Sequence, residues 1–443
     1  MVIFDIKALD MTGVYNSFVQ QFNQLASYYF LYVPLGVIGS WRWGVWIIKY
    51  LAGRRYRPLV GDRTAKYSVS IITPVYKEDP KTFERALYSW DRNEPDEIIA
   101  VIDYRELECI RIFEKFSRET TMARLIITQK PGKRNALADG IRAAKGDIVA
   151  LVDSDTIWSA DIKEISLAAF SNNTIGGVST RQRITNPQNI WQIVTDMLWE
   201  TRNSVDLPAQ VASNKAVSCL SGRTAFYRKD LILPHLDYFL NEIIFGRKKE
   251  SGDDKCLTRI IHRQGWHSYF QYNAIIYSSG PQDFKMFWKQ RIRWARNSYN
   301  SDLQAMREGW LWKYPFLAFY LIDRFITPFS QLISPIIFAS ALYLSHWSIA
   351  FGITILWIGG RAVRNWSYLR SNPSNFRFIP IYVFINFALS AAKIYAMVTI
   401  KNQLTIRDRG TPPRTVNTIA VGVTILIIVG LFILTTLLTG VLK

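Results

Sequence analysis

The sequence predicts a mainly parallel α/β domain that is inserted between transmembrane helices. Long apolar runs occur near the start of the 443-residue chain and throughout its last third. Between them, short β-branched runs alternate with helical patterns, as in a water-soluble α/β domain. Hydrophobic residues make up 49% of the chain and aromatic residues 14%, which is high for a wholly soluble protein.

The net charge and the cysteine usage narrow the choice of partners. A formal net charge of +19 is compatible with nucleic acid, an anionic lipid surface or an anionic substrate. The basic residues gather beside the apolar runs, which argues against nucleic acid. Three cysteines without a Cys-x-x-Cys pattern indicate neither a disulfide framework nor a zinc site, and this fits a domain that faces the cytosol.

The first apolar run, residues 28–53, is longer than the about 20 residues that a helix needs to cross a bilayer. It contains Arg42, which has to face protein or reach the interface. The basic stretch "RRYRP" (54–58) follows and places the next domain in the cytosol. A cleaved signal peptide is the alternative, although the run starts late and has no small-residue cleavage pattern. We expect residues 1–58 to form an N-terminal segment with one transmembrane helix.

Residues 59–300 form the predicted cytosolic domain. Near-continuous apolar strands that are separated by helices indicate a parallel sheet covered on both faces. Ligands of such sheets bind beyond the carboxyl ends of the strands. The predicted strands are 68–76, 96–104, 123–129 and 146–155, and the helices between them are 80–91, 107–118 and 133–145.

Residues 301–443 are predicted to form interfacial and transmembrane helices at about 320–344, 348–363, 378–400 and 417–441. The region 378–400 has basic segments on both sides, and both segments favour the cytosol. We therefore expect it to be re-entrant or interfacial rather than a single crossing, which hints at a channel. The alternative is that the charge rule fails here and the region spans the membrane.

Acidic residues gather where the predicted strands end. Asp153 and Asp155 stand in "ALVDSDTIW", directly after one strand, and Asp103 and the segment "TPVYKED" (73–79) end two others. Because carboxyl ends of parallel strands share one edge of the sheet, these groups should face one ligand site. A polar strand end that turns into solvent is the alternative, because Asp and Ser are common in turns.

Two further motifs begin helices. "PGKRNAL" (131–137) puts Lys133 and Arg134 at a helix N-terminus, which already favours anions, although a solvated basic turn would look the same. "SGDDKCLT" (251–258) places Asp253 and Asp254 before another helix. An N-cap explains one of these carboxylates but does not require two.

The last motifs are "KQRIRWARN" (289–297) and "SCLSGRTAFYR" (218–228). The first places Gln290, Arg293 and Trp294 at helical spacing, with an arginine suited to bidentate phosphate contact and a tryptophan that either stacks on a sugar or belongs to the core. The second reads as a strand that runs into a tight turn at Gly222.

These parts match what a nucleotide-sugar transferase needs. A divalent cation held by carboxylate oxygens neutralises the diphosphate leaving group, and cationic side chains hold the phosphates. A carboxylate away from the metal takes the proton from the attacking hydroxyl. The sequence offers Asp155 for the first task and Asp254 for the second.

The ordered set "TPVYKED", Asp103, "GKR", "DSD", "GDD" and "QRIRW" resembles the family 2 inverting glycosyltransferases, specifically the membrane-embedded processive synthases of cellulose, chitin and hyaluronan. The likeness covers about residues 50–414, and "GGVSTRQRITNP" (176–187) and "CLSGRTAFYR" look closest to the bacterial type 3 capsular polysaccharide synthases. It implies a GT-A-type, Rossmann-like cytosolic domain and processive, inverting transfer from a UDP-sugar to a polysaccharide that is secreted across the plasma (inner) membrane.

The resemblance also implies residue roles. Asp155 would bind Mg²⁺ or Mn²⁺, and Asp254 beside Asp253 would be the catalytic base. The acceptor would meet Trp294, Cys219 and Gly222. Gating would fall to Thr411 and Arg414 in "RGTPPR", where the family's tryptophan is missing. The nucleotide-sugar would contact Thr73, Pro74, Tyr76, Glu78, Asp103, Lys133, Arg134, Asp153, Gln290 and Arg293.

Two other functions stay open at this point. A non-processive transferase that makes a glycolipid or a lipid-linked sugar would share the catalytic set but would need no channel. A basic, membrane-anchored binding protein would need no catalytic base at all. The expected partners are a UDP-sugar, a polysaccharide acceptor and membrane lipid, and not nucleic acid.

Overall fold

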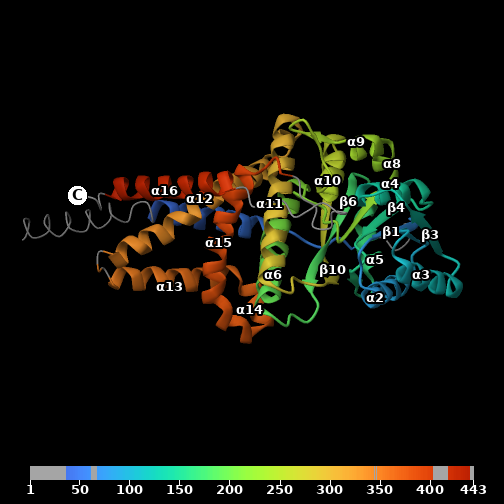
Figure 1. Cartoon of the computed structure of the whole chain (residues 1–443), viewed down its shortest axis with the longest axis horizontal. Coiled ribbons are helices and arrows are strands. Elements are labelled where there is room, and N and C mark those ends of the chain that lie inside the picture. The colour runs from blue at the N-terminus through green and yellow to red at the C-terminus, as the bar shows by residue number, and fades with distance from the viewer. Residues whose placement is uncertain (1–35, 61–66, 344, 346, 403–417, 440–443) are drawn as a thin grey trace, which may run out of the picture.

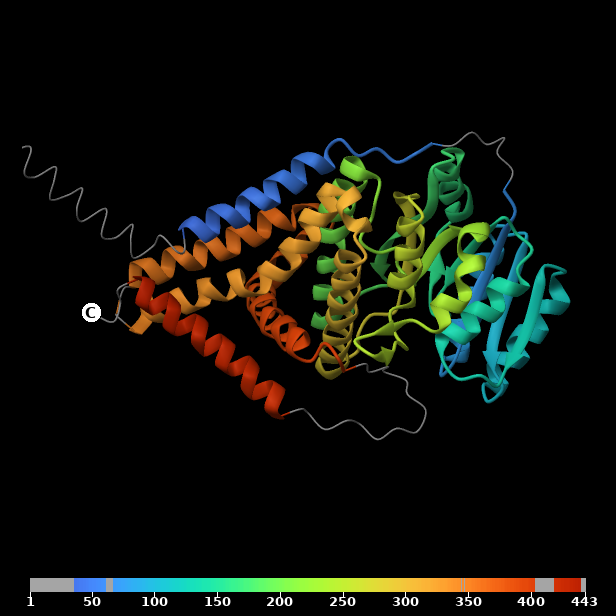
Figure 2. The same cartoon turned by 90° about the horizontal axis from the view of Figure 1, so that it is seen from above.

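The computed structural model describes residues 36–60, 67–343, 345, 347–402 and 418–439. An α/β domain lies at one end of the molecule, and a set of long helices extends away from it (Figures 1 and 2). Two helices, α6 (Ile190–Thr201) and α11 (Phe284–Arg307), lie between these parts. Helix α11 crosses the boundary that the sequence placed between residues 300 and 301.

The α/β domain is built on an eight-stranded sheet with the strand order β3-β2-β1-β4-β7-β6-β10-β5. Four neighbouring pairs are parallel, whereas β7 is antiparallel to both β4 and β6, and β5 is antiparallel to β10. The predicted mainly parallel sheet is therefore confirmed. The strands are β1 (Val69–Val75), β2 (Glu97–Asp103), β3 (Ala123–Thr128), β4 (Ile148–Val152), β5 (Ile157–Trp158), β6 (Ile175–Ile184), β7 (Thr224–Arg228) and β10 (His267–Ser278), with a separate pair β8 (Ile243–Ile244) and β9 (Arg247–Lys248).

Helices cover both faces of the sheet, which explains why the central strands are apolar along their whole length (Figure 1). One face carries α2 (Pro80–Asp91), α3 (Leu107–Glu119) and α5 (Ile162–Leu167). The opposite face carries α4 (Lys133–Ala143), α8 (Lys229–Ile232), α9 (Leu236–Leu240) and α10 (Asp253–Arg263). Helix α4 packs closely on β1, because a Cβ atom at Gly140 would lie 2.4 Å from Cγ2 of Ile72.

One prediction about local structure was wrong. The segment 218–228 was expected to run as a strand into the turn at Gly222, but the turn comes first and β7 begins at Thr224. The backbone before Gly222 is not a strand, because β7 pairs with β4 only from Thr224 onward and with β6 only from Ala225 onward. The two residues Gly222 and Arg223 therefore lie at the same sheet edge as the end of β4.

The remaining helices form the extended part of the molecule. They are residues 36–53, α7 (Leu207–Asn214), α12 (Pro315–Tyr343), α13 (Trp347–Arg364), α14 (Trp366–Ser371), α15 (Ile379–Val398) and α16 (Thr418–Thr439). Short 3₁₀ segments occur at Ala168–Ser171, Leu233–His235, Trp310–Lys313 and Pro373–Phe378, and a π-helical turn occupies Arg202–Asp206.

Two described helical segments, Pro315–Tyr343 and Pro373–Val398, are long and apolar enough to cross a membrane. Their directions differ. Helix α12 runs along the long axis of the molecule together with α13, α16 and the helix at 36–53 (Figures 1 and 2). Helix α15 runs across this direction, because it is seen from the side in Figure 1 and nearly end-on in Figure 2.

Two cations of the helix at 36–53 are paired with a carboxylate of α12. Asp323 of α12 is 4% exposed and accepts hydrogen bonds from Arg42 at 2.6 Å and from Lys49 at 2.9 Å. Directly after the helix at 36–53, the hydroxyl of Tyr56 donates to the carbonyl of Phe270 in β10 at 2.6 Å. The first described helix is thus fixed both to α12 and to the sheet.

Candidate active site

Lys133 brings two of the predicted acidic motifs together. Its Nζ atom lies 2.6 Å from Oδ1 of Asp153 and 3.1 Å from Oδ2 of Asp253. Burial alone would lower the pKa of Lys133, but these two carboxylates outweigh it and raise the pKa above its usual value. Burial acts to raise the pKa of Asp253, and the Lys133 ammonium reverses the effect, so that the pKa is lowered. Lys133 and Asp253 are therefore both charged at neutral pH.

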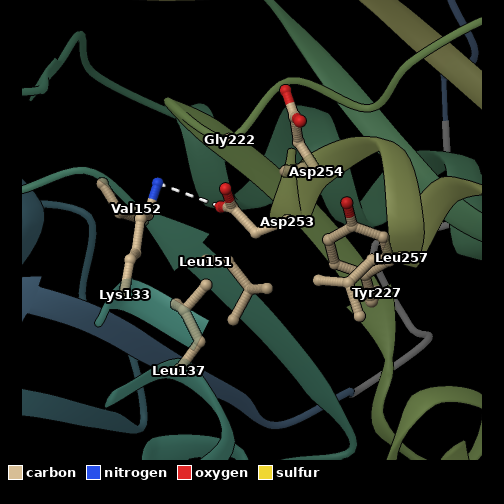
Figure 3. A pocket seen from close by; sticks show the side chains of 10 residues that line it. Lys133, Leu137, Leu151, Val152, Gly222, Tyr227, Asp253, Asp254 and Leu257 are labelled. Carbon is tan, nitrogen blue, oxygen red and sulfur yellow. Dashed lines mark ion pairs between the residues drawn. The ribbon is translucent and has the colours of Figure 1, made fainter. Parts of the chain in front are cut away.

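A small cavity lies beside this ion pair (Figure 3). It is lined by Lys133, Leu137, Leu151, Val152, Gly222, Ala225, Tyr227, Asp253, Asp254 and Leu257. Figure 3 shows the carboxylate of Asp253 turned toward Lys133 and that of Asp254 turned away from it. A Cβ atom at Gly222 would lie 3.5 Å from both Lys133 Nζ and Asp253 Oδ2. The backbone of Gly222 therefore lies against this ion pair.

Asp254 is held by uncharged donors. Its Oδ2 atom lies 3.3 Å from Sγ of Cys219, and its Oδ1 atom accepts a hydrogen bond from the backbone N–H of Lys255 at 2.8 Å. In the described part of the chain it forms no ion pair. The two adjacent carboxylates of "GDD" thus differ in their environment: Asp253 forms an ion pair with a lysine, whereas Asp254 borders the cavity and has no ion pair among the described residues.

Asp155, the predicted metal ligand, accepts a hydrogen bond from the hydroxyl of Ser279 at 2.9 Å through Oδ2. Among the described residues, no group of three His, Cys, Asp or Glu side chains could hold a cation together. One carboxylate oxygen suits Mg²⁺ or Mn²⁺ when substrate phosphates and water supply the other ligands. The donor set at Asp155 fits a cation that is shared with a phosphate-bearing substrate.

The residues predicted to bind the nucleoside lie at the ends of β1 and β2. Asp103 is 2% exposed and accepts a hydrogen bond from Arg105 Nε at 3.2 Å. Glu78 accepts one from the hydroxyl of Ser154 at 2.7 Å, which joins the "TPVYKED" loop to "DSD". The guanidinium of Arg105 lies over the ring of Tyr76, with its Cζ atom 5.8 Å from the ring centre. Within β1, Thr73 is fully buried and Pro74 is partly buried. Thr73 therefore supports this edge of the sheet from within the protein.

Arg134 occupies a different environment from the predicted nucleotide site. It is 5% exposed, and its Nη2 atom donates to Glu242 Oε2 at 2.6 Å and approaches the carbonyls of Ser251 at 3.3 Å and Gly252 at 3.4 Å. These carbonyls directly precede Asp253. The guanidinium is occupied by protein groups, which include the backbone of the "GDD" turn.

The "QRIRW" motif lies on α11 and faces the carboxylates. Arg293 is within electrostatic range of Asp153, Asp253 and Asp254. Its Nε atom and Oε1 of Gln290 are buried without a hydrogen-bond partner among the described residues. Buried polar atoms of this kind usually have partners, and a ligand that bears phosphates could supply them. These two residues remain good candidates for contact with the diphosphate.

Sequence reasoning missed Arg223. Its guanidinium lies over the rings of Trp199, at 4.4 Å, and of Trp294, at 5.3 Å, and its Nε donates to the hydroxyl of Ser278 at 2.8 Å. The only signal for it was a cation inside the turn after Gly222. The predicted gating residues Thr411 and Arg414 lie outside the described residues.

Known proteins resemble the chain over most of its length. It is 27% identical over 381 residues to the hyaluronan synthase of Streptococcus pyogenes, a match that covers 81% of this chain and 88% of the relative. It is 26% identical over 380 residues to a type 2 glycosyltransferase of Zymoseptoria tritici, covering 80% and 79% of the two chains.

A solved mannosyltransferase from Pyrobaculum calidifontis, in complex with GDP-Man and Mn²⁺, has a similar fold, with a TM-score of 0.59, 17% identity and coverage of 81% of this chain and 99% of its own. This likeness confirms the GT-A-type fold. The family model described as "Glycosyltransferase like family 2" matches residues 68–297, more than half of the chain, which confirms the resemblance drawn from the motifs. The chain therefore belongs to the glycosyltransferase family 2 and is a glycosyltransferase.

Proposed function

We propose that this protein transfers sugars from a UDP-sugar to the growing end of a polysaccharide, with inversion at the anomeric carbon, and that transfer is coupled to secretion. The observation that carries the proposal is the difference between the contacts of the two carboxylates in "GDD". Lys133 neutralises Asp253, whereas Asp254 forms no ion pair among the described residues and borders the cavity. A carboxylate in this state can accept the proton of an attacking hydroxyl.

The remaining groups of the site suit the diphosphate of the donor. Arg293 and Gln290 offer buried atoms without partners beside the carboxylates, and such atoms suit the oxygens of a diphosphate. Asp155 would hold Mg²⁺ or Mn²⁺, and the cation would neutralise charge on the diphosphate as it leaves. The Mn²⁺ in the solved mannosyltransferase supports a divalent ion in this role.

The proposed location is the plasma (inner) membrane, with the catalytic domain in the cytosol. The basic segments "RRYRP" and those on both sides of α15 support this orientation. Helix α15 runs across α12 and α13, which supports an interfacial or re-entrant position for it (Figures 1 and 2). The same arrangement supports a passage for a secreted polymer next to the catalytic domain.

Incubation of the purified full chain, in detergent with lipid, with single and paired radiolabelled UDP-sugars and Mn²⁺ tests the proposal. We expect UDP release together with a polymer or a ladder of products on sizing gels, and neither product with the Asp254→Asn variant. A single added sugar on lipid would contradict processive transfer. Absence of UDP release from every donor, with the protein folded, would contradict the proposed donor class.

A further inference from the structure

Arg223 is fixed at the centre of the site by its backbone. Strand β7 pairs antiparallel with β4, with Thr224 opposite Val152. One residue further along, the carbonyl of Arg223 accepts a hydrogen bond from the N–H of Asp153 at 3.1 Å. The turn that carries Arg223 is thus bonded to the first residue of "DSD", and any ligand of that motif lies close to the arginine.

The side chain of Arg223 is held in one orientation. Two indole rings lie on it, those of Trp199 from α6 and Trp294 from α11, and Ser278 accepts a hydrogen bond from its Nε. Stacking of this kind orients the planar guanidinium and reduces the entropy that a ligand contact would cost. The next residue, Ser279, donates to Asp155, so adjacent hydroxyls at the end of β10 hold this cation and the predicted metal ligand.

The charge of Arg223 is not matched by a carboxylate. In the described part of the chain it forms no ion pair, and no hydrogen bond from its Nη1 or Nη2 atoms is found there. Arg293 likewise forms no ion pair there, and the two guanidinium groups are within electrostatic range of each other. Burial lowers the pKa of Arg223, although Asp155, Asp153 and Asp254 oppose this effect. Neither guanidinium forms an ion pair with these carboxylates in the described part of the chain, so a bound anion would stabilise both charges.

The position of Arg223 in the sheet indicates which part of a nucleotide-sugar it would meet. Asp103 ends β2, and β1 and β4 separate β2 from β7. Three strand spacings of about 4.8 Å place the turn before β7 about 14 Å from the end of β2. This distance separates Arg223 from a nucleoside bound at Asp103 and leaves it beside Asp153 and Asp155.

We propose that Arg223 binds the β-phosphate of the donor's diphosphate, together with Arg293. This inference rests on the proposed function for the identity of the donor, and it adds a phosphate ligand to which the sequence motifs assigned no role. Its Nη1 and Nη2 atoms can form the paired hydrogen bonds that arginine makes with phosphate oxygens. The stack of Trp199, Arg223 and Trp294 would then join the leaving group to the acceptor-side tryptophan.

The test compares UDP with UMP, which lacks the β-phosphate, by equilibrium binding to the purified full chain with Mn²⁺ and again with EDTA. For Arg223→Gln we expect the UDP affinity to fall about tenfold or more and the UMP affinity to change less than about twofold. Arg223→Lys should recover part of the UDP affinity, because it keeps the charge. If lysine lowers the UDP and UMP affinities alike, the residue acts only by stacking and the proposal is wrong.

Arg228→Gln is the matched control on the same strand. Its guanidinium donates to the carbonyls of Ile175 and Phe170, away from the site, so both affinities should stay at the wild-type level. Equal losses of UDP and UMP affinity in Arg223→Gln, or no loss of either, would overturn the proposal.

The binding comparison does not depend on turnover. If the wild-type chain binds UDP but transfers no sugar, the proposed function fails and the role of Arg223 can still be measured. If the enzyme is active and Arg223→Gln leaves the ratio of UDP to UMP affinity unchanged, this inference fails alone.

Discussion

The Sγ atom of Cys219 lies 3.3 Å from Oδ2 of Asp254, so the proposed base accepts a hydrogen bond from a thiol. Burial, and then the charge of Asp254, raises the pKa of Cys219 to about 12. The thiol is therefore protonated at neutral pH and acts as the donor. It orients the carboxylate without neutralising it, which a lysine in the same place would do.

Replacing Cys219 by alanine should lower kcat roughly three- to tenfold, because one hydrogen bond to the base is lost. The affinity for UDP should not change. Cys219→Ser, which keeps a donor, should recover most of the rate. Steady-state kinetics with the proposed donor checks this, and Cys109→Ala, a buried cysteine on α3, is the control. Equal losses in the alanine and serine variants would mean that Cys219 acts by packing.

Asp254→Asn should keep the affinity for the UDP-sugar within about threefold and reduce turnover by at least about 10²-fold, because the acceptor proton then has no base. Calorimetric binding and single-turnover rates separate the two effects. Asp237→Asn, at a carboxyl that is 95% exposed, provides the control. A parallel loss of donor binding would identify Asp254 as a ligand instead.

Asp155→Ala should abolish metal-dependent transfer, because it removes the carboxylate proposed to bind the cation. Mn²⁺ titrations followed by electron paramagnetic resonance should show weaker Mn²⁺ binding in the presence of UDP. Wild-type activity that persists with a chelator present would show that this assignment is wrong.

Arg134→Leu should destabilise the protein by about 3–5 kcal/mol, because Glu242 loses one of its buried cationic partners. Thermal unfolding of the purified protein measures the loss. Arg142→Leu, on the same helix but with a side chain that is 45% exposed, should change stability by less than about 1 kcal/mol. An Arg134→Lys variant that folds normally but has a much higher donor KM would support the nucleotide-binding role predicted from the sequence.

Lys249→Met should stabilise the protein at pH 7. Burial lowers the pKa of Lys249 to about 8, although Glu242 opposes it, and its Nζ atom has no hydrogen-bond partner among the described residues. Below pH 8 the folded state carries the whole cost of the buried charge, which is at most about 3 kcal/mol. From pH 8 to about 10.5 the unfolded lysine holds a proton that the folded one has lost, so wild-type stability rises.

The gain from Lys249→Met should therefore shrink as the pH increases through this window. Unfolding temperatures measured between pH 7 and 10 check the trend, and Lys248→Met is the exposed neighbouring control. A gain of the same size at every pH would place the effect in packing rather than in charge.

The sheet was predictable because its central strands are buried on both faces and therefore read as apolar runs. The positions of the "DSD" and "GDD" carboxylates were also predictable, because the first pair follows a strand and the second pair begins a helix. Contacts between distant segments were not visible in the sequence. Arg134 meets Glu242 108 residues later, and Arg223 reaches the site only because β7 enters the sheet antiparallel between β4 and β6. The spacing of motifs along the chain does not reveal such long-range contacts.

The ion pairs of Asp323 also bear on how the chain is made. In the proposed topology, Arg42 and Lys49 enter the membrane with the first helix, but their carboxylate partner lies 281 and 274 residues further along the chain. At ~5–20 residues per second, a ribosome needs roughly 15 s to 1 min to supply it. A lone arginine or lysine at mid-membrane costs about 2.5–3.5 kcal/mol. The first helix should therefore stay next to the insertion machinery until α12 emerges, so its final burial is a late step of biogenesis.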